Sequence, residues 1–430
     1  MRAEEKPMDR LGGNMPDLLI MAQVREAFTR AAERFSVSSV LAGLHVRVRL
    51  TIDAESVDLV VTDGQAGLEE MSGAADISIQ AGAETWANIL ASKPPPTFHS
   101  FTALQLKNAS VQVTGDPLRI AQARQALERL FEALRPPPTD RMSRVERNLG
   151  IISGGYATLT IDDTRTTLFF EESGRGLPVV FLHTAGADAR QYQAFLADVG
   201  LAERWHMFAF DMPAHGRSMP ELLDGVAPYR LTQQRYASIV TAFLRTVVRQ
   251  PGVLIGCSMG AAIALVVAAD APELLRAAIA LEPPLKSPGR GNPYLAHPMV
   301  ATGTHNSAYV AGLMSPTTPR AAKRAAEWIY SQAAPSVYPG DLAFYSDEFD
   351  GNVVAPKIDT ARVPVHLMTG EYDYSATPDD GARLASLIAG STFERMEGLG
   401  HFPMVEDPDR VRGLLERAVE RCLSRNPSTL

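Results

Sequence analysis

A serine, an aspartate and a histidine stand in sequence contexts that could support nucleophilic catalysis. Ser258 is the centre of Gly-Cys-Ser-Met-Gly and follows the apolar run 252–255, while Asp373 and His401 each come just after a later apolar run. A serine hydroxyl is a poor nucleophile at neutral pH, so it needs a base within hydrogen-bond reach and a carboxylate that orients this base. The chain offers both partners, and the predicted chemistry is acyl transfer through a serine.

The surroundings of Ser258 predict a sharp turn between a buried strand and a buried helix. Residues 252–255 are apolar, and residues 261–268 are rich in Ala, Leu and Val. Gly256 and Gly260 lie two positions on either side of Ser258, where backbone must approach backbone closely. The hydroxyl is then pushed outward, although a tight turn with a capping serine would have the same pattern.

The region after residue 150 alternates strands and helices, which is typical of a mostly parallel, doubly wound α/β sheet. In such a sheet the site forms at the carboxyl ends of the strands, where Asp373 and His401 are expected. Between residues 286 and 357 the alternation stops and the pattern becomes helical and irregular. We interpret this segment as a cap inserted over the carboxyl edge of the sheet.

The segments HTAGAD, DMPAHGRS, GCSMGAA, TGEYDYSATP and MEGLGHFPMVEDP make residues 153–424 similar to the α/β-hydrolase superfamily. The resemblance implies an α/β-hydrolase fold with Ser258 as nucleophile, His401 as general base and Asp373 as the residue that orients the base. The order serine, acid, histidine is the order expected for that superfamily. Glu282 is the competing acid, because a carboxylate at the end of its strand could also reach the histidine.

An acyl-transfer enzyme must stabilise an oxyanion, usually with two backbone N–H groups. The first expected donor is the Met259 N–H, directly after the nucleophile. The second should come from the loop His183-Thr184-Ala185-Gly186, with Ala185 as first choice and Thr184 as second. The resembling family commonly has glycine where Thr184 stands, which leaves the choice of donor open.

The residues before the linker predict a separate α+β domain. Residues 44–52 alternate strictly between apolar and polar, which indicates a half-buried strand, and the stretches 56–64 and 75–81 are expected as antiparallel neighbours. A short helix at 84–92, a strand at 111–113 and a helix capped by Asp116 with Pro117 in its first turn should follow. The fold class is therefore a small α+β domain followed by the larger α/β domain.

The order of these elements resembles the sterol-carrier-protein-2-like (SCP2-like) fold over residues 18–135, most clearly in ADISIQAGAETWANIL and SVQVTGDPLRIAQARQALERLF. This resemblance implies an apolar tunnel for a lipid-like ligand. A module used only for dimerisation or docking is the alternative, and a homo-oligomer formed through this domain stays open. The expected boundaries are an SCP2-like domain at 1–136, a linker at 137–150 and a hydrolase domain at 151–430.

Composition limits the partners and the compartment. A net charge of -8 offers no basic field for nucleic acid, and no apolar stretch is long enough to predict a membrane span. With only Cys257 and Cys422, a disulfide framework is not expected, which fits a cytoplasmic location. No spacing of ligands predicts a metal, and no glycine-rich loop predicts a phosphate cofactor, so we expect no cofactor.

The sequence thus predicts a serine hydrolase that cleaves a carboxylic ester of a lipophilic or aromatic small molecule through an acyl-enzyme. Hydrolysis of a carbon–carbon bond in ring-cleavage-type ketones is the first alternative, and thioesterase and amidase activities are others, because the fold does not separate these reactions. A protein that only binds a lipophilic ligand is the alternative outside enzymes.

Overall fold

The computed structural model of the protein describes residues 15–34, 43–138, 143–161, 163–220 and 229–425. The chain divides into two compact units, Met1–Pro136 and Pro137–Leu430. The expected linker at 137–150 falls at the start of the second unit, and its residues 139–142 lie outside the described residues. Each unit has a sheet and a hydrophobic core of its own.

The N-terminal unit holds a five-stranded sheet in the order β3-β2-β1-β4-β5. The buried residues of its strands and helices form one core cluster, in which Phe28 packs edge-on against Trp86 and Phe131. The elements are α1 (Met15–Arg34), β1 (His45–Ile52), β2 (Glu55–Thr62), β3 (Gln65–Glu69), β4 (Ile77–Ala81), α2 (Ala83–Leu90), α3 (Phe101–Lys107), β5 (Val111–Gly115) and α4 (Pro117–Ala133).

Local sequence explains most of these elements. In β1 the residues Val46, Val48, Leu50 and Ile52 are buried and alternate with partly exposed ones, as a sheet with one covered face requires. The carboxylate of Asp116 accepts a hydrogen bond from Leu118 N–H, and Pro117 opens α4.

The expectation that residues 75–81 continue the sheet as an antiparallel neighbour is wrong. Strand β4 pairs parallel with β1 and antiparallel with β5. The reason is β3, which forms a hairpin with β2. The sequence predicts only a turn in this stretch. Because β3 occupies the outer edge of β2, the chain returns to the free edge of β1, and this return makes the pairing parallel.

The C-terminal unit holds an eight-stranded sheet in the order β13-β12-β11-β10-β8-β9-β7-β6. The hairpin β6–β7 and the pair β7–β9 are antiparallel, and the remaining pairs are parallel. The strands are β6 (Ser153–Ile161), β7 (Thr164–Gly174), β8 (Leu177–Leu182), β9 (Trp205–Phe210), β10 (Gly252–Cys257), β11 (Leu275–Leu281), β12 (Val365–Gly370) and β13 (Thr392–Met396).

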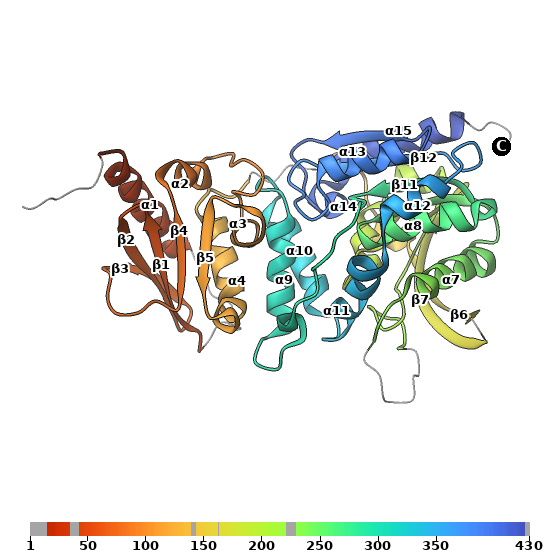
Figure 1. Cartoon of the computed structure of the whole chain (residues 1–430). Coiled ribbons are helices and arrows are strands. Elements are labelled where there is room, and N and C mark those ends of the chain that lie inside the picture. Colours follow the sequence, from red (N-terminus) through yellow and green to blue (C-terminus); the bar gives the residue numbers. More distant parts are fainter. Residues whose placement is uncertain (1–14, 35–42, 139–142, 162, 221–228, 426–430) are drawn as a thin grey trace, which may run out of the picture. The chain divides into compact units, whose positions relative to one another are not determined.

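Helices cover this sheet. The buried residues of α7 and α8, which lie side by side in green in Figure 1, share one core cluster with the sheet and with α13, while α15 packs on β11, β12 and α5. The helices named here are α5 (Gln193–Leu196), α7 (Gln233–Phe243), α8 (Met259–Asp270), α13 (Pro378–Leu387) and α15 (Pro408–Ser424). The result is the mostly parallel α/β layering that the alternation of strands and helices predicted.

The segment between β11 and β12 is helical. Its elements are α9 (Thr302–Leu313), α10 (Arg320–Ser331), α11 (Val337–Leu342) and α12 (Gly351–Val354), and α9 packs against α10 (Figure 1). Helix α10 also packs against α14 (Pro403–Glu406), which follows β13. Within the part of the chain that the structure describes, no helix is long and apolar enough to cross a membrane.

Candidate active site

Ser258 occupies a strained turn between β10 and α8. Its φ of 56° lies in the left-handed region, which side-chain-bearing residues rarely adopt. The two flanking glycines make the turn sterically possible, because a Cβ on Gly256 would lie 2.0 Å from the Gly260 carbonyl oxygen. A Cβ on Gly260 would lie 2.3 Å from the carbonyl oxygen of Leu182 in β8. The Ser258 backbone N–H donates to the Leu281 carbonyl of β11, which ties the turn to the next strand.

The structure brings Ser258, His401 and Asp373 together in one hydrogen-bonded chain. The distance from Ser258 Oγ to His401 Nε2 is 2.9 Å, and the distance from His401 Nδ1 to Asp373 Oδ2 is 2.6 Å. All three residues are buried. The carboxylate accepts from Nδ1–H, so Nε2 is left to accept the serine proton. Such an arrangement can generate a serine nucleophile.

Glu282 is hydrogen-bonded to Asp373, and it is Asp373 that contacts His401 Nδ1. Both carboxyl oxygens of Glu282 lie within 3.0 Å of Gly370 N. Burial, followed by the negative charge of Asp373, raises the pKa of Glu282 well above its ordinary value. Burial also opposes ionisation of Asp373, but His401 and the hydrogen bond from Glu282 hold the pKa of Asp373 below its ordinary value. The shared proton therefore belongs to Glu282.

Glu282, Asp373 and His401 are also the one group of potential metal ligands among the described residues, with ligand atoms within 4.8 Å of one another. The atoms are already engaged, because Asp373 accepts from His401 and shares a proton with Glu282. A cation would have to displace that proton, so this donor set fits a hydrogen-bonded acid pair better than a metal.

The loop after β8 keeps one of the two predicted oxyanion donors without an acceptor. Within the described residues, the N–H groups of Ala185 and Met259 have no hydrogen-bond acceptor. The Thr184 N–H donates to Gln191 Oε1 over 3.0 Å, so this group is already occupied. Of the two expected donors in the loop, Ala185 keeps an N–H that an oxyanion could use.

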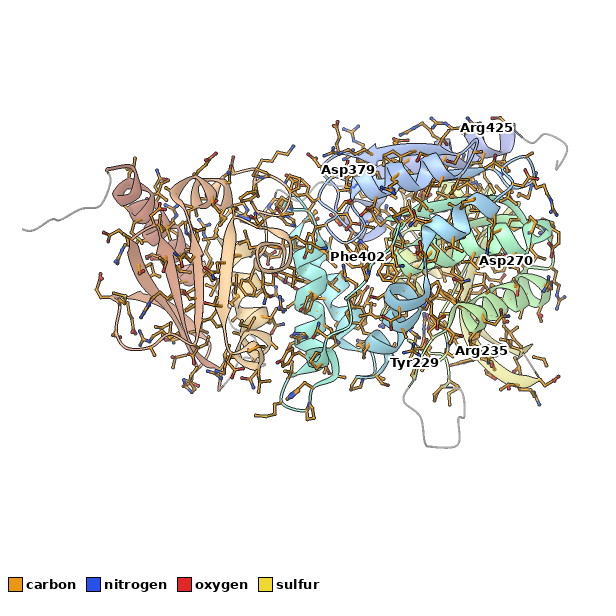
Figure 2. All side chains as sticks on the ribbon, viewed as in Figure 1. Tyr229, Arg235, Asp270, Asp379, Phe402 and Arg425 are labelled. Atoms are coloured by element: carbon orange, nitrogen blue, oxygen red, sulfur yellow. The ribbon has the colours of Figure 1, made fainter. Side chains whose placement is uncertain are left out.

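The predicted cap segment holds that same loop through Asp341 of α11. Asp341 Oδ2 accepts from the Gly186 N–H at 2.8 Å, and Oδ1 accepts from the hydroxyl of Tyr229, which Figure 2 labels. His215 Nε2 lies 2.8 Å from Asp341 Oδ2, and its Nδ1 lies 2.9 Å from the Pro213 carbonyl. Two acceptors require two N–H donors, so His215 is an imidazolium; burial opposes this charge, but Asp341 raises the pKa of His215 above its ordinary value.

His183 and Asp211 act as scaffold groups. His183 Nε2 accepts from the Met212 N–H, and burial, followed by the neighbouring His215, lowers the pKa of His183 to about 4, so the ring stays neutral. The Asp211 carboxylate accepts from the backbone N–H groups of Ala189 and Arg217 and so anchors the loop after β9.

The sequence reasoning missed Glu406 of α14, which shapes the loop that carries His401. Its Oε1 accepts from the Phe402 N–H, and its Oε2 accepts from the N–H groups of Gly400 and Ser315 and from the Thr318 hydroxyl. Phe402, labelled in Figure 2, directly follows the histidine. The signal in the sequence was an acid five residues after His401, followed by Asp-Pro, but its four donors come together only in the fold.

With this geometry in hand, the sequence matches the Alpha/beta hydrolase family over residues 179–414, which is more than half of its 430 residues. The chain therefore belongs to the alpha/beta hydrolase family. The prediction of an α/β-hydrolase enzyme is confirmed at the level of this family. This match begins at residue 179 and does not cover the N-terminal unit, whose SCP2-like resemblance stays a prediction.

The match to an individual relative is weaker and covers less of the chain than the family match. The chain is 28% identical over 133 residues to 2-(acetamidomethylene)succinate hydrolase of Mesorhizobium japonicum, which is 31% of this chain and 45% of that protein. The aligned part thus spans less than half of that relative.

Solved structures share the fold of the C-terminal region. A thermophilic esterase from Thermogutta terrifontis has a TM-score of 0.53 at 18% identity, with 62% of this chain and 99% of that chain covered. The enol-lactonase from Burkholderia xenovorans has a TM-score of 0.51 at 18% identity, with 62% and 98% covered. At these identities the likeness is one of fold.

Replacement of Glu406 by alanine should destabilise the C-terminal unit. The variant leaves the buried N–H groups of Gly400, Phe402 and Ser315 without an acceptor, and each such loss costs about 1–3 kcal/mol. We expect a decrease in the free energy of unfolding of about 3 kcal/mol or more, measured by urea denaturation. Glu406→Gln keeps one acceptor oxygen and should lose less. A loss below about 1 kcal/mol for the alanine variant would contradict this role.

Replacement of Glu282 by glutamine should change how stability depends on pH. Folding raises the pKa of Glu282, so its stabilising contribution is complete below the ordinary value of 4.5 and is lost as the pH rises through the higher folded-state pKa. The glutamine can still donate to Asp373 and has no such proton to lose. The unfolding free energy of the wild type minus that of Glu282→Gln should therefore fall as the pH rises from 4.5.

Thermal melts at several pH values measure this difference. The exposed Glu420→Gln is the matched control and should show no such slope. A wild-type advantage that stays constant with pH would show that Glu282 does not hold the proton.

Proposed function

We propose that the protein is a serine hydrolase that cleaves carboxylic esters through an acyl-enzyme, with Ser258 as nucleophile, His401 as general base and Asp373 as the orienting acid. One observation carries the proposal: the continuous hydrogen-bonded chain from Ser258 Oγ through His401 to Asp373, with distances of 2.9 and 2.6 Å. The strained turn supports it, because folds rarely retain a left-handed serine without a functional reason.

The mechanism follows from the positions of these atoms. Ser258 Oγ attacks the ester carbonyl carbon while its proton passes to His401 Nε2, and the carbonyl oxygen becomes an oxyanion. The N–H groups of Met259 and Ala185 donate to that oxyanion. The tetrahedral intermediate then expels the alcohol, which takes the proton from His401, and an acyl-serine remains. Water repeats the sequence on the acyl-serine and releases the acid.

The acid pair tunes the base. Once His401 takes the serine proton it is positively charged, and the ionised Asp373 stabilises that charge. Glu282 donates its proton to Asp373 and so keeps a second negative charge out of a buried site. Two ionised carboxylates would bind the imidazolium too strongly and slow the release of its proton.

The comparisons support an acyl-bond substrate. The curated relative is named a hydrolase, and the two structural neighbours are named an esterase and an enol-lactonase. For this chain we propose an ester of a small lipophilic or aromatic molecule, because aromatic side chains of the segment between β11 and β12 approach the site. Tyr330 of α10 hydrogen-bonds the Thr184 hydroxyl and packs edge-on against Phe402.

For the N-terminal unit we propose an SCP2-like role in capturing a lipid-like substrate. The support is its arrangement of a five-stranded sheet with four helices around one apolar core among the described residues. Its buried charges are used for structure: Asp58 accepts from Arg47 and Arg49 on the sheet. The catalytic groups proposed above all come from the other unit.

Ser258→Ala tests the proposed nucleophile. Loss of the nucleophile should lower kcat on p-nitrophenyl acetate by a factor on the order of 10⁴ to 10⁶ without changing the thermal melt. Asp373→Asn should lower kcat by about 10⁴-fold, because the tautomer of His401 is no longer held.

Glu282→Gln is the matched control for the acid, because it changes the neighbouring carboxyl but keeps a donor toward Asp373. We expect it to lose less than about 10-fold. Turnover of Ser258→Ala within tenfold of the wild type would remove this serine from the mechanism, and a larger loss in Glu282→Gln than in Asp373→Asn would reverse the assignment of the acid.

A truncated chain that begins at Met142 tests the division of labour. Because it keeps every proposed catalytic group, it should retain turnover of p-nitrophenyl acetate, while kcat/KM for a long-chain ester such as p-nitrophenyl palmitate should fall relative to the full chain. Kinetics beside calorimetry and light scattering would measure activity, folding and oligomeric state. A folded truncated chain with no turnover of the small ester would show that the first unit completes the active site.

A further inference from the structure

Arg290, at the start of the segment between β11 and β12, is a cation without an acidic partner. Its Nη1 donates to Ser375 Oγ at 2.6 Å, its side chain is hydrogen-bonded to the Tyr338 hydroxyl, and its backbone N–H donates to Ser346 Oγ. No carboxylate of the described residues lies within 4.0 Å of the guanidinium, whereas the nearby Lys286 is paired with Asp350. The partners of Arg290 are neutral hydroxyls.

The contacts of Arg290 place it next to the proposed active site. On one side, Ser375 donates its backbone N–H to Asp373 Oδ1 at 2.7 Å. On the other side, the Tyr338 ring packs against the loop of the proposed oxyanion donor, since a Cβ on Gly186 would lie 2.8 Å from a carbon of that ring. One residue on each side, Ser375 or Tyr338, thus separates the guanidinium from Asp373 and from the loop after β8 that carries Ala185.

The surroundings leave hydrogen-bonding capacity unused. A guanidinium has five N–H donors in a planar fork that matches a carboxylate, and Arg290 uses part of them on two hydroxyls. Tyr345 is 2% exposed, and its hydroxyl has no hydrogen-bond partner within the described residues. Tyr345 is also one of the groups whose electrostatic interaction raises the pKa of Arg290. Burial lowers the pKa of Arg290, but Tyr338, Tyr345 and Tyr374 raise it, as does the negative charge of Asp373, so the group stays charged.

A partly buried charge that no carboxylate of the described residues contacts directly is costly, and the part of the fork not used by protein groups can accept a ligand. We propose that Arg290 is a specificity-determining residue that binds a carboxylate of the substrate, with the Tyr345 hydroxyl as a further donor. The preferred substrate is then an ester that carries a second, anionic group beside an apolar part. This proposal rests on the esterase function proposed above.

The test compares pairs of esters that differ only by one methyl cap. The first pair is p-nitrophenyl hydrogen adipate and its methyl ester, with the carboxylate on the acyl side. The second pair is 4-acetoxybenzoate and its methyl ester, with the carboxylate on the leaving group. For each pair, the ratio of kcat/KM for the charged ester to kcat/KM for the neutral ester is measured in the wild type, Arg290→Met and Arg290→Lys.

We expect the wild type to prefer the charged ester in at least one pair, and Arg290→Met to lower that ratio by tenfold or more, mainly through KM. Arg290→Lys keeps the charge but not the fork and should lower the ratio less; it also serves as the test if the methionine variant fails to fold. Arg245→Met, which removes an exposed arginine paired with Glu273, is the control for net charge and should keep the ratio.

Equal losses on both members of a pair, together with a shifted pH profile, would mean that Arg290 acts only through Asp373, and would overturn the proposal. No preference in the wild type, or an unchanged ratio in Arg290→Met and Arg290→Lys, would overturn it as well. If the wild type hydrolyses none of the four esters, the esterase function fails. Calorimetric binding of the same esters to the wild type and to Arg290→Met then decides: a tenfold weaker affinity for the charged ester alone supports the carboxylate site, and equal affinities overturn it.

Discussion

The close approach of α8 to the strands in front of it is the constraint on which the site depends. The backbone at Gly260 lies so close to Leu182 in β8 that a single methyl group would collide with it, and Gly256 is held equally close to Gly260. The chain can make this turn only if Ser258 takes a left-handed conformation, at a cost of about 1–3 kcal/mol. Packing of α8, which is buried from Met259 to Ala268, stabilises the fold enough to hold this turn.

Buried carboxylates fix the loops around that turn. Each accepts at least one backbone N–H group from a loop or a strand end at the carboxyl edge of the sheet, where strand ladders end and leave such groups without partners. A carboxylate can receive several donors at once and can thus set the path of a loop that has no regular structure. Asp211 holds the loops at 189 and 217, Asp341 holds the loop at 186, and Glu406 holds the loop at 400–402. Glu282 holds Gly370 at the end of β12.

The sequence carried enough information to predict the α/β class of the larger unit and to single out three candidate catalytic residues, because both depend on local patterns. A serine between glycines after an apolar run, and a histidine and an aspartate after later runs, are visible in the order of residues alone. The placement of β4 was wrong because strand order depends on which sheet edge is free, and the short, partly exposed β3 gave a weak signal. Glu406 and Arg290 were missed because their partners lie far away in the chain, as Ser375 does for Arg290.

The unpaired arginine and the apolar surroundings together define how the site could select its substrate. An ester with a carboxylate in the right place would satisfy the guanidinium and gain its charged hydrogen bonds. A neutral ester of the same size would cover the guanidinium and leave it without either water or a counter-ion, which is unfavourable. Selection by a partly buried polar group of this kind discriminates more strongly than an apolar pocket does, because the wrong substrate is penalised as well as less well bound. The tyrosine rings around Arg290 would still contact the apolar part of the substrate. The same few residues can therefore select for both a carboxylate and an apolar group in one substrate.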